Sequence, residues 1–220
     1  MLKNPLTHKA VYVLSDITIM VLVSGGGTNL QALLDAEKTG GLGRGKITLV
    51  VSDRGGAYAL ERAQAAGVPT ITVALNKNTG REERRQALSD HILRLAETHH
   101  IDLIVYAGFL WILKGAIIEA YAGRMINLHP ALLPQFGGKG MYGEHVHRAV
   151  LDAGEQESGC TVHLVDAGTD TGPILLQRKV PVLPNDTPET LAQRIHKEEH
   201  IAIVEAVKIM VEQLNNYSTE

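Results

Sequence analysis

Short runs of apolar residues alternate along the chain with longer stretches in which apolar residues recur every three or four positions. The short runs predict strands of a parallel sheet that is covered on both faces, and the longer stretches predict amphipathic helices. We expect strands at residues 17–24, 46–53, 69–73, 102–108, 124–129, 160–166 and 173–182. We expect helices at residues 28–38, 57–66, 81–98, 144–152 and 187–214, and another between 108 and 124.

The last two expected strands are separated only by the turn at 167–172, a spacing typical of a hairpin. The predicted fold is therefore α/β and Rossmann-like. It has a mostly parallel twisted sheet of about seven strands with helices on both faces and an antiparallel C-terminal hairpin strand. No repeat, low-complexity tract or linker divides the chain. The expected units are one domain (17–214) with two halves (17–123 and 124–214), an N-terminal extension (1–16) and a C-terminal tail (215–220).

Composition narrows the classes of function. Hydrophobic residues make up 45% of the 220, which excludes a disordered chain, and the net charge of −3 argues against a nucleic-acid partner. A single cysteine, Cys160, cannot form an internal disulfide, and no apolar run reaches the ~20 residues that span a membrane. We therefore expect a cytoplasmic globular protein without a membrane partner, either a monomer or a homodimer.

Glycine is enriched, with 22 residues, and three of them stand together at 25–27, between the first expected strand and helix. Glycines let a ligand approach the backbone, and a helix N-terminus offers free N–H groups, so this segment predicts phosphate binding. Leu30 stands where a dinucleotide-binding pattern has its third glycine, although Asp53 would suit the ribose of NAD. A tight turn without a ligand is the alternative.

A second glycine-rich segment, residues 40–46, matches the letters of a phosphate-binding P-loop. The next residue is Ile47 instead of Ser or Thr, and a strand follows instead of a helix. We interpret this segment as a flexible surface loop.

Asn127 and His129 lie two positions apart at the end of the fifth expected strand, so their side chains should point the same way. Open α/β sheets bind ligands at the carboxyl ends of their strands. An amide donor beside an imidazole is suited to stabilising a developing oxyanion. The alternative is a histidine that only satisfies hydrogen bonds at a strand end.

Two acids, Asp166 and Asp170, lie in the glycine-bearing turn between the last two strands. A carboxylate close to His129 would raise the pKa of the imidazole and orient it, or would accept a proton. The alternative is that both acids serve the geometry of the turn.

His196 and His200 lie one helical turn apart, but the residues between them do not form a metal-binding motif, and we expect no metal site. Glu199 beside them is suited to sugar hydroxyls. Weaker expectations concern the other histidines: a core position for His163 and a place in a pocket wall for His145 or His147.

Four segments carry a resemblance: VSGGGTNLQAL, YAGFLWIL, INLHPALLP and CTVHLVDAGTDTGPILLQ. In this order, and over residues 17–212, the chain resembles the glycinamide ribonucleotide formyltransferases of purine biosynthesis. These enzymes belong to the 10-formyltetrahydrofolate-dependent formyltransferase superfamily. The NLHPALLP and D-x-G-x-D-x-G-P elements are shared across that superfamily, whereas SGGGTNLQ and the single-domain length favour this member.

The resemblance implies roles for individual residues. The catalytic residues would be Asn127, His129 and Asp170. The phosphate and ribose of glycinamide ribonucleotide would meet Gly27, Thr28, Asn29 and Glu199. The folate would meet Arg81, Gly108, Phe109, Leu110, Trp111, Ile112, Leu113, Asp166, Ala167, Gly168 and Asp170. Residues 17–123 would then be the nucleotide-binding half and residues 124–214 the folate-binding and catalytic half, and Trp111 departs from members that carry Arg there.

The implied reaction moves a formyl group from the cosubstrate 10-formyltetrahydrofolate to the amine of glycinamide ribonucleotide, without a metal. Asn127 and a protonated His129 would stabilise the oxyanion, while Asp170 keeps His129 charged and helps to remove the amine proton. The alternatives are a 10-formyltetrahydrofolate hydrolase, a non-catalytic nucleotide- or folate-binding module and, more remotely, an NAD oxidoreductase. A methionyl-tRNA formyltransferase is disfavoured because it normally has a further C-terminal domain and a basic face.

Overall fold

The computed structural model describes residues 15–217, and its centre is a seven-stranded sheet in the order β3-β2-β1-β4-β5-β6-β7. The strands are β1 (Ile17–Val23), β2 (Gly45–Ser52), β3 (Thr70–Thr72), β4 (Leu103–Tyr106), β5 (Met125–His129), β6 (Glu157–Leu164) and β7 (Ile174–Pro181). Strands β1 to β5 pair in parallel, and β6 and β7 are antiparallel. The predicted sheet is confirmed, including its antiparallel C-terminal end.

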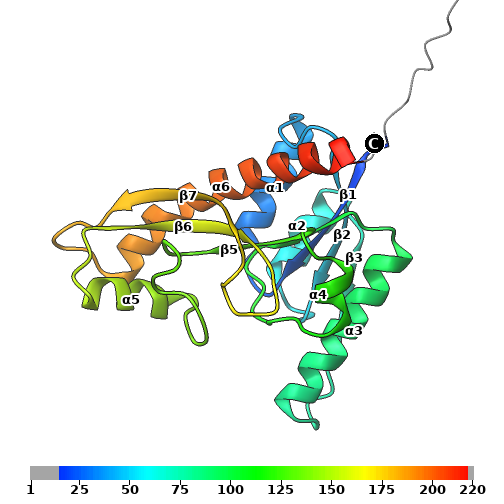
Figure 1. Cartoon of the computed structure of the whole chain (residues 1–220), viewed down its shortest axis with the longest axis horizontal. Coiled ribbons are helices and arrows are strands. Elements are labelled where there is room, and N and C mark those ends of the chain that lie inside the picture. Colours follow the sequence, from blue (N-terminus) through cyan, green and yellow to red (C-terminus); the bar gives the residue numbers. More distant parts are fainter. Residues whose placement is uncertain (1–14, 218–220) are drawn as a thin grey trace, which may run out of the picture.

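Six helices surround the sheet over the described residues: α1 (Thr28–Lys38), α2 (Tyr58–Ala65), α3 (Arg81–Thr98), α4 (Ala116–Ala120), α5 (Glu144–Asp152) and α6 (Pro188–Tyr217). Buried side chains of α1, α2, α5 and α6 join one core cluster, and those of α3 and α4 join a second. Helix α6 runs from the hairpin end of the sheet back toward β1 (Figure 1). Helices therefore cover both faces of the sheet, as predicted.

Alternation along β1 explains why its apolar run is unbroken. Ile19, Val21 and Val23 enter one core cluster, whereas Met20 and Leu22 enter the other. Both faces of the strand are thus removed from water, and each buried aliphatic side chain contributes about 1.5–3 kcal/mol to stability.

The ends of the chain differ slightly from the expected units. Helix α6 continues to Tyr217, past the expected end at 214, and Leu214 packs against the core. The first residues of the expected tail are therefore helical. The expected N-terminal extension lies outside the described residues except for Ser15 and Asp16.

The glycine-rich segment at 40–46 is more tightly packed than a surface loop. Leu42 is fully buried, and a Cβ at Gly45 would lie 2.9 Å from side-chain atoms of both Ile19 and Val211. The segment is a compact turn into β2, and the expectation of a flexible loop is wrong in that respect.

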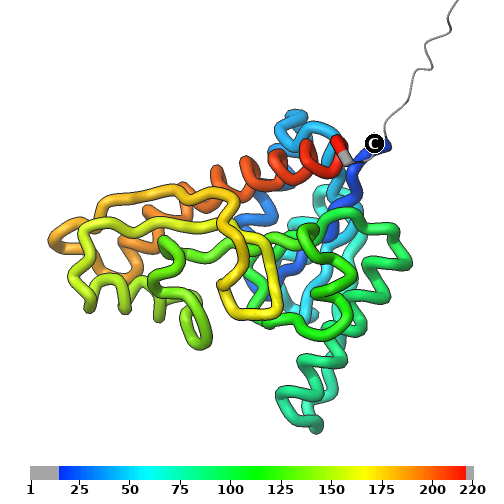
Figure 2. Tube along the Cα trace, viewed as in Figure 1, coloured from blue at the N-terminus to red at the C-terminus, as the bar shows by residue number. Residues whose placement is uncertain are grey.

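The strand order creates a crevice at one edge of the sheet. The chain leaves β1 toward β2 and β3, but β4 and β5 lie on the other side of β1, so the loops after β1 and β4 diverge. The hydroxyl of Ser24 accepts from the Leu110 amide at 3.1 Å, which ties the two loops together. Figure 2 shows the β6–β7 hairpin extending beyond this parallel part of the sheet, with α6 running alongside it. No helix of the described chain combines the length and apolar character needed to cross a membrane.

Candidate active site

A pocket of about 410 Å³ opens at the carboxyl ends of β1, β4 and β5. Its wall includes segments 25–29, 106–113, 127–130 and 138–143, together with residues from the β6–β7 turn and α6. Every residue predicted for the site lines this pocket except Ala167, which lies between two residues that do. The structure therefore gathers side chains that are up to 172 positions apart, since Gly27 and Glu199 share one cavity.

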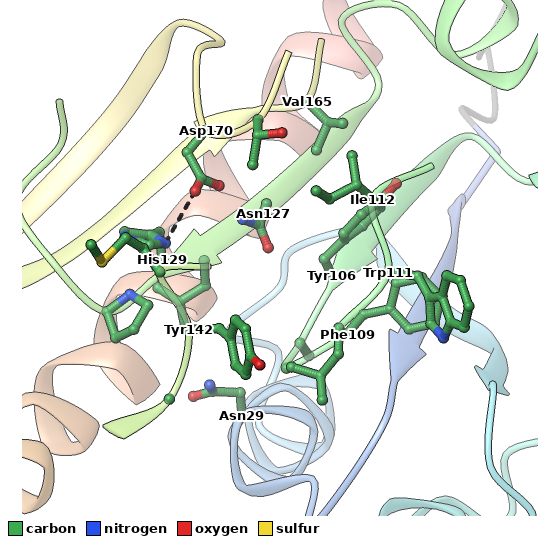
Figure 3. Close-up of a pocket in the computed structure, with 18 of the residues that line it drawn as sticks. Asn29, Tyr106, Phe109, Trp111, Ile112, Asn127, His129, Tyr142, Val165 and Asp170 are labelled. Atoms are coloured by element: carbon green, nitrogen blue, oxygen red, sulfur yellow. Dashed lines mark ion pairs between the residues drawn. The ribbon is translucent and has the colours of Figure 1, made fainter. Parts of the chain in front are cut away.

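His129 is only 4% exposed and has a fixed tautomer. Its Nε2 lies 2.8 Å from the carbonyl oxygen of Phe136, which can only accept, so Nε2 carries a proton. Its Nδ1 faces Asp170 Oδ2 at 3.6 Å (Figure 3). Burial lowers the pKa of His129 below its ordinary value, and the opposing effects of Asp170 and the Phe136 carbonyl do not cancel it. Asp170 thus raises the pKa of His129, as expected, but burial outweighs this effect and the net shift is downward.

Asp170 is held in a left-handed backbone conformation, with φ of 58°. Burial by itself would raise the pKa of its carboxyl. The Gly138 amide, which donates to Oδ2 at 2.9 Å, and the nearby imidazoles of His163 and His129 instead hold the pKa below its ordinary value. Asp170 is thus an ionised carboxylate whose oxygens are aimed at two histidines.

The second of these histidines, His163, is buried, as expected, but it also lines the pocket. It lies opposite Asn127 in the β5–β6 register. Its Nδ1 donates to the carbonyl oxygen of Leu164 at 2.8 Å, which leaves Nε2 to accept from Asn127 Nδ2 at 3.1 Å. Nε2 also lies 3.5 Å from Asp170 Oδ1. His163 therefore holds the amide of Asn127 and lies beside the carboxylate of Asp170, and only the antiparallel register could have indicated this.

The two acids of the β6–β7 turn have different roles. Asp166 Oδ1 accepts hydrogen bonds from the Gly168 amide at 3.0 Å and from the Thr171 hydroxyl at 2.7 Å, which is turn chemistry. Asp170, by contrast, faces His129. Asp166 therefore serves the geometry of the turn, whereas Asp170 is the carboxylate that lies close to His129.

The glycine turn after β1 presents its amide side to the pocket. The carbonyls of Gly25 and Gly26 are occupied by the Ala59 amide and by Arg62 Nε, at 3.0 and 2.8 Å. Gly27 has φ of 72°, and a Cβ there would lie 2.5 Å from Ala59 Cβ, so only glycine fits. Helix α1 begins at Thr28 without a side-chain cap or an acid in its first turn. Its free N–H groups suit a phosphate.

Glu199 lies beside this turn and is 4% exposed. Its Oε2 lies 2.7 Å from His196 Nδ1 and 3.5 Å from Asn29 Nδ2. The neighbouring carboxylate raises the pKa of His196, while burial lowers the pKa of His147, which also lines the pocket. Within residues 15–217 no group of three or more His, Cys, Asp or Glu side chains is placed to hold a metal ion.

The opposite wall of the pocket is aromatic and aliphatic (Figure 3). Tyr106 and Phe109 pack edge to face with their ring centroids 5.6 Å apart. The indole N–H of Trp111 donates to Asp53 Oδ2 at 2.9 Å. Asp53, the acid that an NAD site would require, is therefore occupied by Trp111.

Three polar atoms in the pocket wall are buried and lack a hydrogen-bond partner among the described residues: Asn29 Oδ1, Tyr106 Oη and His147 Nδ1. Each such atom costs about 1–3 kcal/mol unless something pairs with it. They lie at both ends of the pocket, so a ligand or ligands with polar groups at each end would satisfy them.

A family model described as formyl transferase matches residues 17–207. The chain belongs to this formyl transferase family. The family match confirms the resemblance noted in the sequence.

Relatives within the family carry more specific names. Phosphoribosylglycinamide formyltransferase of Escherichia coli is 39% identical over 84% of this chain and 82% of its own length. The solved glycinamide ribonucleotide transformylase 1 of Symbiobacterium toebii is 41% identical, with a TM-score of 0.80 over 90% of this chain and 89% of its own. The trifunctional purine biosynthetic protein adenosine-3 of Drosophila melanogaster is 41% identical, but this chain spans only 14% of its length.

Proposed function

We propose that this formyl transferase moves the formyl group of 10-formyltetrahydrofolate to the amine of glycinamide ribonucleotide. The observation that carries the proposal is the facing pair His129–Asp170 beside Asn127, in one pocket with the amide-lined turn before α1. The names of the relatives in Escherichia coli and Symbiobacterium toebii support this substrate. The products are N-formylglycinamide ribonucleotide and tetrahydrofolate.

The pocket offers a place to each substrate. The phosphate would bind the N–H groups of Gly27, Thr28 and Asn29, and the ribose hydroxyls would bind Glu199. The buried, unpaired Asn29 Oδ1 and His147 Nδ1 lie on this side of the pocket and fit such a ligand. The residues proposed for the folate are Arg81, segment 108–113, Asp166, Gly168 and Asp170, with Ala167 included on the family resemblance.

The cosubstrate supplies the formyl carbon, and the side chains move the proton. Asn127, held by His163, donates to the formyl oxygen as negative charge develops on it. His129 begins neutral, so its Nδ1 accepts the amine proton, and Asp170 stabilises the resulting imidazolium. The new C–N bond forms as the bond from the formyl carbon to folate N10 breaks, and His129 returns the proton to N10.

The test is an assay of tetrahydrofolate release with and without glycinamide ribonucleotide. We expect release only when the amine is present, whereas release that ignores it would indicate the hydrolase. His129→Ala and Asp170→Asn should each lower kcat by ~10²–10⁴-fold, the usual contribution of general acid–base groups. Lys179→Gln, on the exposed face of β7, is the control and should retain kcat. Near-normal kcat in either site variant would contradict its assignment.

A further inference from the structure

The indole of Trp111 lies between two cavities. Trp111 lines the active-site pocket and also a second cavity of about 760 Å³, whose wall comes mainly from the loops after β2 and β3 and from the start of α3. Figure 3 shows Trp111 at the end of the pocket away from His129 and Asp170. The direction of this one side chain therefore decides where the active-site pocket ends.

Regular structure does not fix that direction, because residues 107–115, between β4 and α4, form neither helix nor strand. The backbone on either side of Trp111 is nevertheless held. The amide of Leu110 donates to the hydroxyl of Ser24 at 3.1 Å, and the carbonyl of Ile112 accepts from Arg85 Nε at 2.6 Å. What remains to be fixed between these two anchors is the rotation of the indole.

Asp53, the first residue after β2, supplies the contact that fixes this rotation. Its side chain is only 5% exposed, and its Oδ2 accepts from the indole N–H of Trp111 at 2.9 Å. Oδ2 also lies 3.5 Å from Arg54 Nε, whereas Oδ1 is buried and has no hydrogen-bond partner among the described residues. A buried carboxylate oxygen without a donor is costly, so stability of the fold alone does not account for an acid at this position.

We propose that Asp53 is a positioning residue for the folate cosubstrate, and that it acts by holding the indole of Trp111 as a fixed wall of the pocket. This inference rests on the proposed function, because it requires the folate to bind against segment 108–113. An indole that is already oriented loses no rotational freedom when the folate binds, so the contact lowers the KM for the folate. His129 and Asp170 lie at the other end of the pocket, so kcat should not depend on Asp53.

The test compares two uncharged variants, Asp53→Asn and Asp53→Leu. Both remove the negative charge, but Asn retains an oxygen that can accept from the indole, whereas Leu has no acceptor. We expect the KM for 10-formyltetrahydrofolate to be about three- to tenfold higher in Asp53→Leu than in Asp53→Asn, which corresponds to one hydrogen bond. The two variants should have the same kcat and the same KM for glycinamide ribonucleotide.

A double-mutant cycle tests whether Asp53 acts through the indole. Trp111→Phe keeps a flat ring but has no N–H to donate, so it should itself raise the KM for the folate. Adding Asp53→Leu to Trp111→Phe should raise this KM no further, because the contact between the two side chains is already lost. Additive increases would mean that Asp53 acts by another route and would overturn the proposal.

Trp111 is the single tryptophan of the chain, so intrinsic tryptophan fluorescence reports on this indole without a ligand. Acrylamide should quench the fluorescence of Asp53→Leu more strongly than that of Asp53→Asn, because an indole without its acceptor turns toward solvent. Equal quenching of the two variants would show that Asp53 does not hold the indole, and would also overturn the proposal.

Asp90→Leu is the matched control. Asp90 Oδ1 accepts one side-chain hydrogen bond, from Gln86 at 2.8 Å, and Asp90 lies outside both cavities, so this variant should keep the wild-type KM for the folate. Thermal unfolding is measured for every variant, and a lower Tm of Asp53→Leu without a higher KM would assign Asp53 a purely structural role. Equal KM values in Asp53→Leu and Asp53→Asn overturn the positioning role alone. A wild type that neither binds the folate nor transfers the formyl group overturns the proposed function and this inference together.

Discussion

Tyr106 contributes a buried hydroxyl to the aromatic wall of the pocket, and that hydroxyl has no hydrogen-bond partner among the described residues. Burial also raises the pKa of Tyr106, so the group stays protonated and can donate. In Figure 3 the oxygen of Tyr106 lies toward Ile112, on the side of the pocket proposed for the folate. An unpaired hydroxyl there destabilises the empty protein and becomes favourable when a ligand pairs with it.

We expect Tyr106→Phe to leave the free energy of unfolding unchanged or to raise it by up to ~1 kcal/mol, since the change removes an unsatisfied group and no contact. Urea denaturation of the unliganded protein measures this. The same variant should gain less thermal stabilisation from added tetrahydrofolate than the wild type does. A loss of stability in the unliganded variant would mean that the hydroxyl has a partner after all.

Residue patterns alone pointed to Asn127 and His129, because a strand end is visible in sequence, whereas the choice of Asp170 over Asp166 came from the family resemblance. The role of His163 was hidden, because it depends on which residue of β5 it faces in an antiparallel register. The protonation of His129 was also hidden. The direction of its pKa shift depends on the balance between burial and the charge of Asp170. The burial of His129 is known only once the loop that carries Phe136 is in place.

At the scale of elements, the hairpin of β6 and β7 depends on close backbone contact. A Cβ at Gly159 in β6 would lie 2.0 Å from the carbonyl oxygen of Arg178 in β7 and 2.9 Å from Leu132 Cδ2. The oxygen belongs to the backbone of the neighbouring strand, so no side-chain rotation can relieve the clash. Strand β6 also carries His163, so the spacing of this hairpin is linked to the geometry of the site.

Gly159→Ala should therefore lower the free energy of unfolding by about 1–3 kcal/mol or more, the usual effect of overpacking. Chemical denaturation checks the size of the loss. Gly56→Ala is the control, because a Cβ there meets no atom within 4 Å and the backbone is not left-handed, so stability should be nearly unchanged. Equal stability of the two variants would show that the strands separate without cost.

The elements themselves were predictable, because a parallel strand that is buried on both faces has apolar residues at successive positions. Among the strands, the poorest boundary is the start of β6 at Glu157, three residues before the expected 160. Residues 157–159 read E-S-G and carry no strand signal, and they are extended because β7 pairs with them. Long-range pairing of this kind overrides local preference.

At the scale of the whole molecule, the pocket draws on both halves of the domain. Arg81 and segment 108–113, expected to meet the folate, precede residue 124, and Glu199, expected to meet the nucleotide, follows it. The expected division at residue 124 therefore does not separate the residues expected to meet the nucleotide from those expected to meet the folate. Two core clusters, one on each face of the sheet, hold these parts in register.

Buried histidines in and around this pocket make the stability of the whole protein depend on pH. Burial lowers the pKa of His129, His147 and His200 below the ordinary value near 6.5. As pH falls below ~6.5, the unfolded chain takes up protons on these positions before the folded chain does, so the free energy of unfolding decreases. His196 behaves in the opposite way, because Glu199 raises its pKa. Its contribution is complete below ~6.5 and is lost as pH rises through the raised pKa.

We therefore expect the free energy of unfolding to fall between pH 6.5 and 5, as measured by urea denaturation at half-unit steps. His147→Gln should flatten that decline, because it removes one of the groups that must take up a proton on unfolding. His196→Gln should leave the slope below pH 6.5 unchanged and alter it only above, where the folded protein holds a proton that the unfolded chain has released. The two variants thus act in separate pH windows. A decline below pH 6.5 that responds to His196→Gln and not to His147→Gln would contradict this assignment of charge.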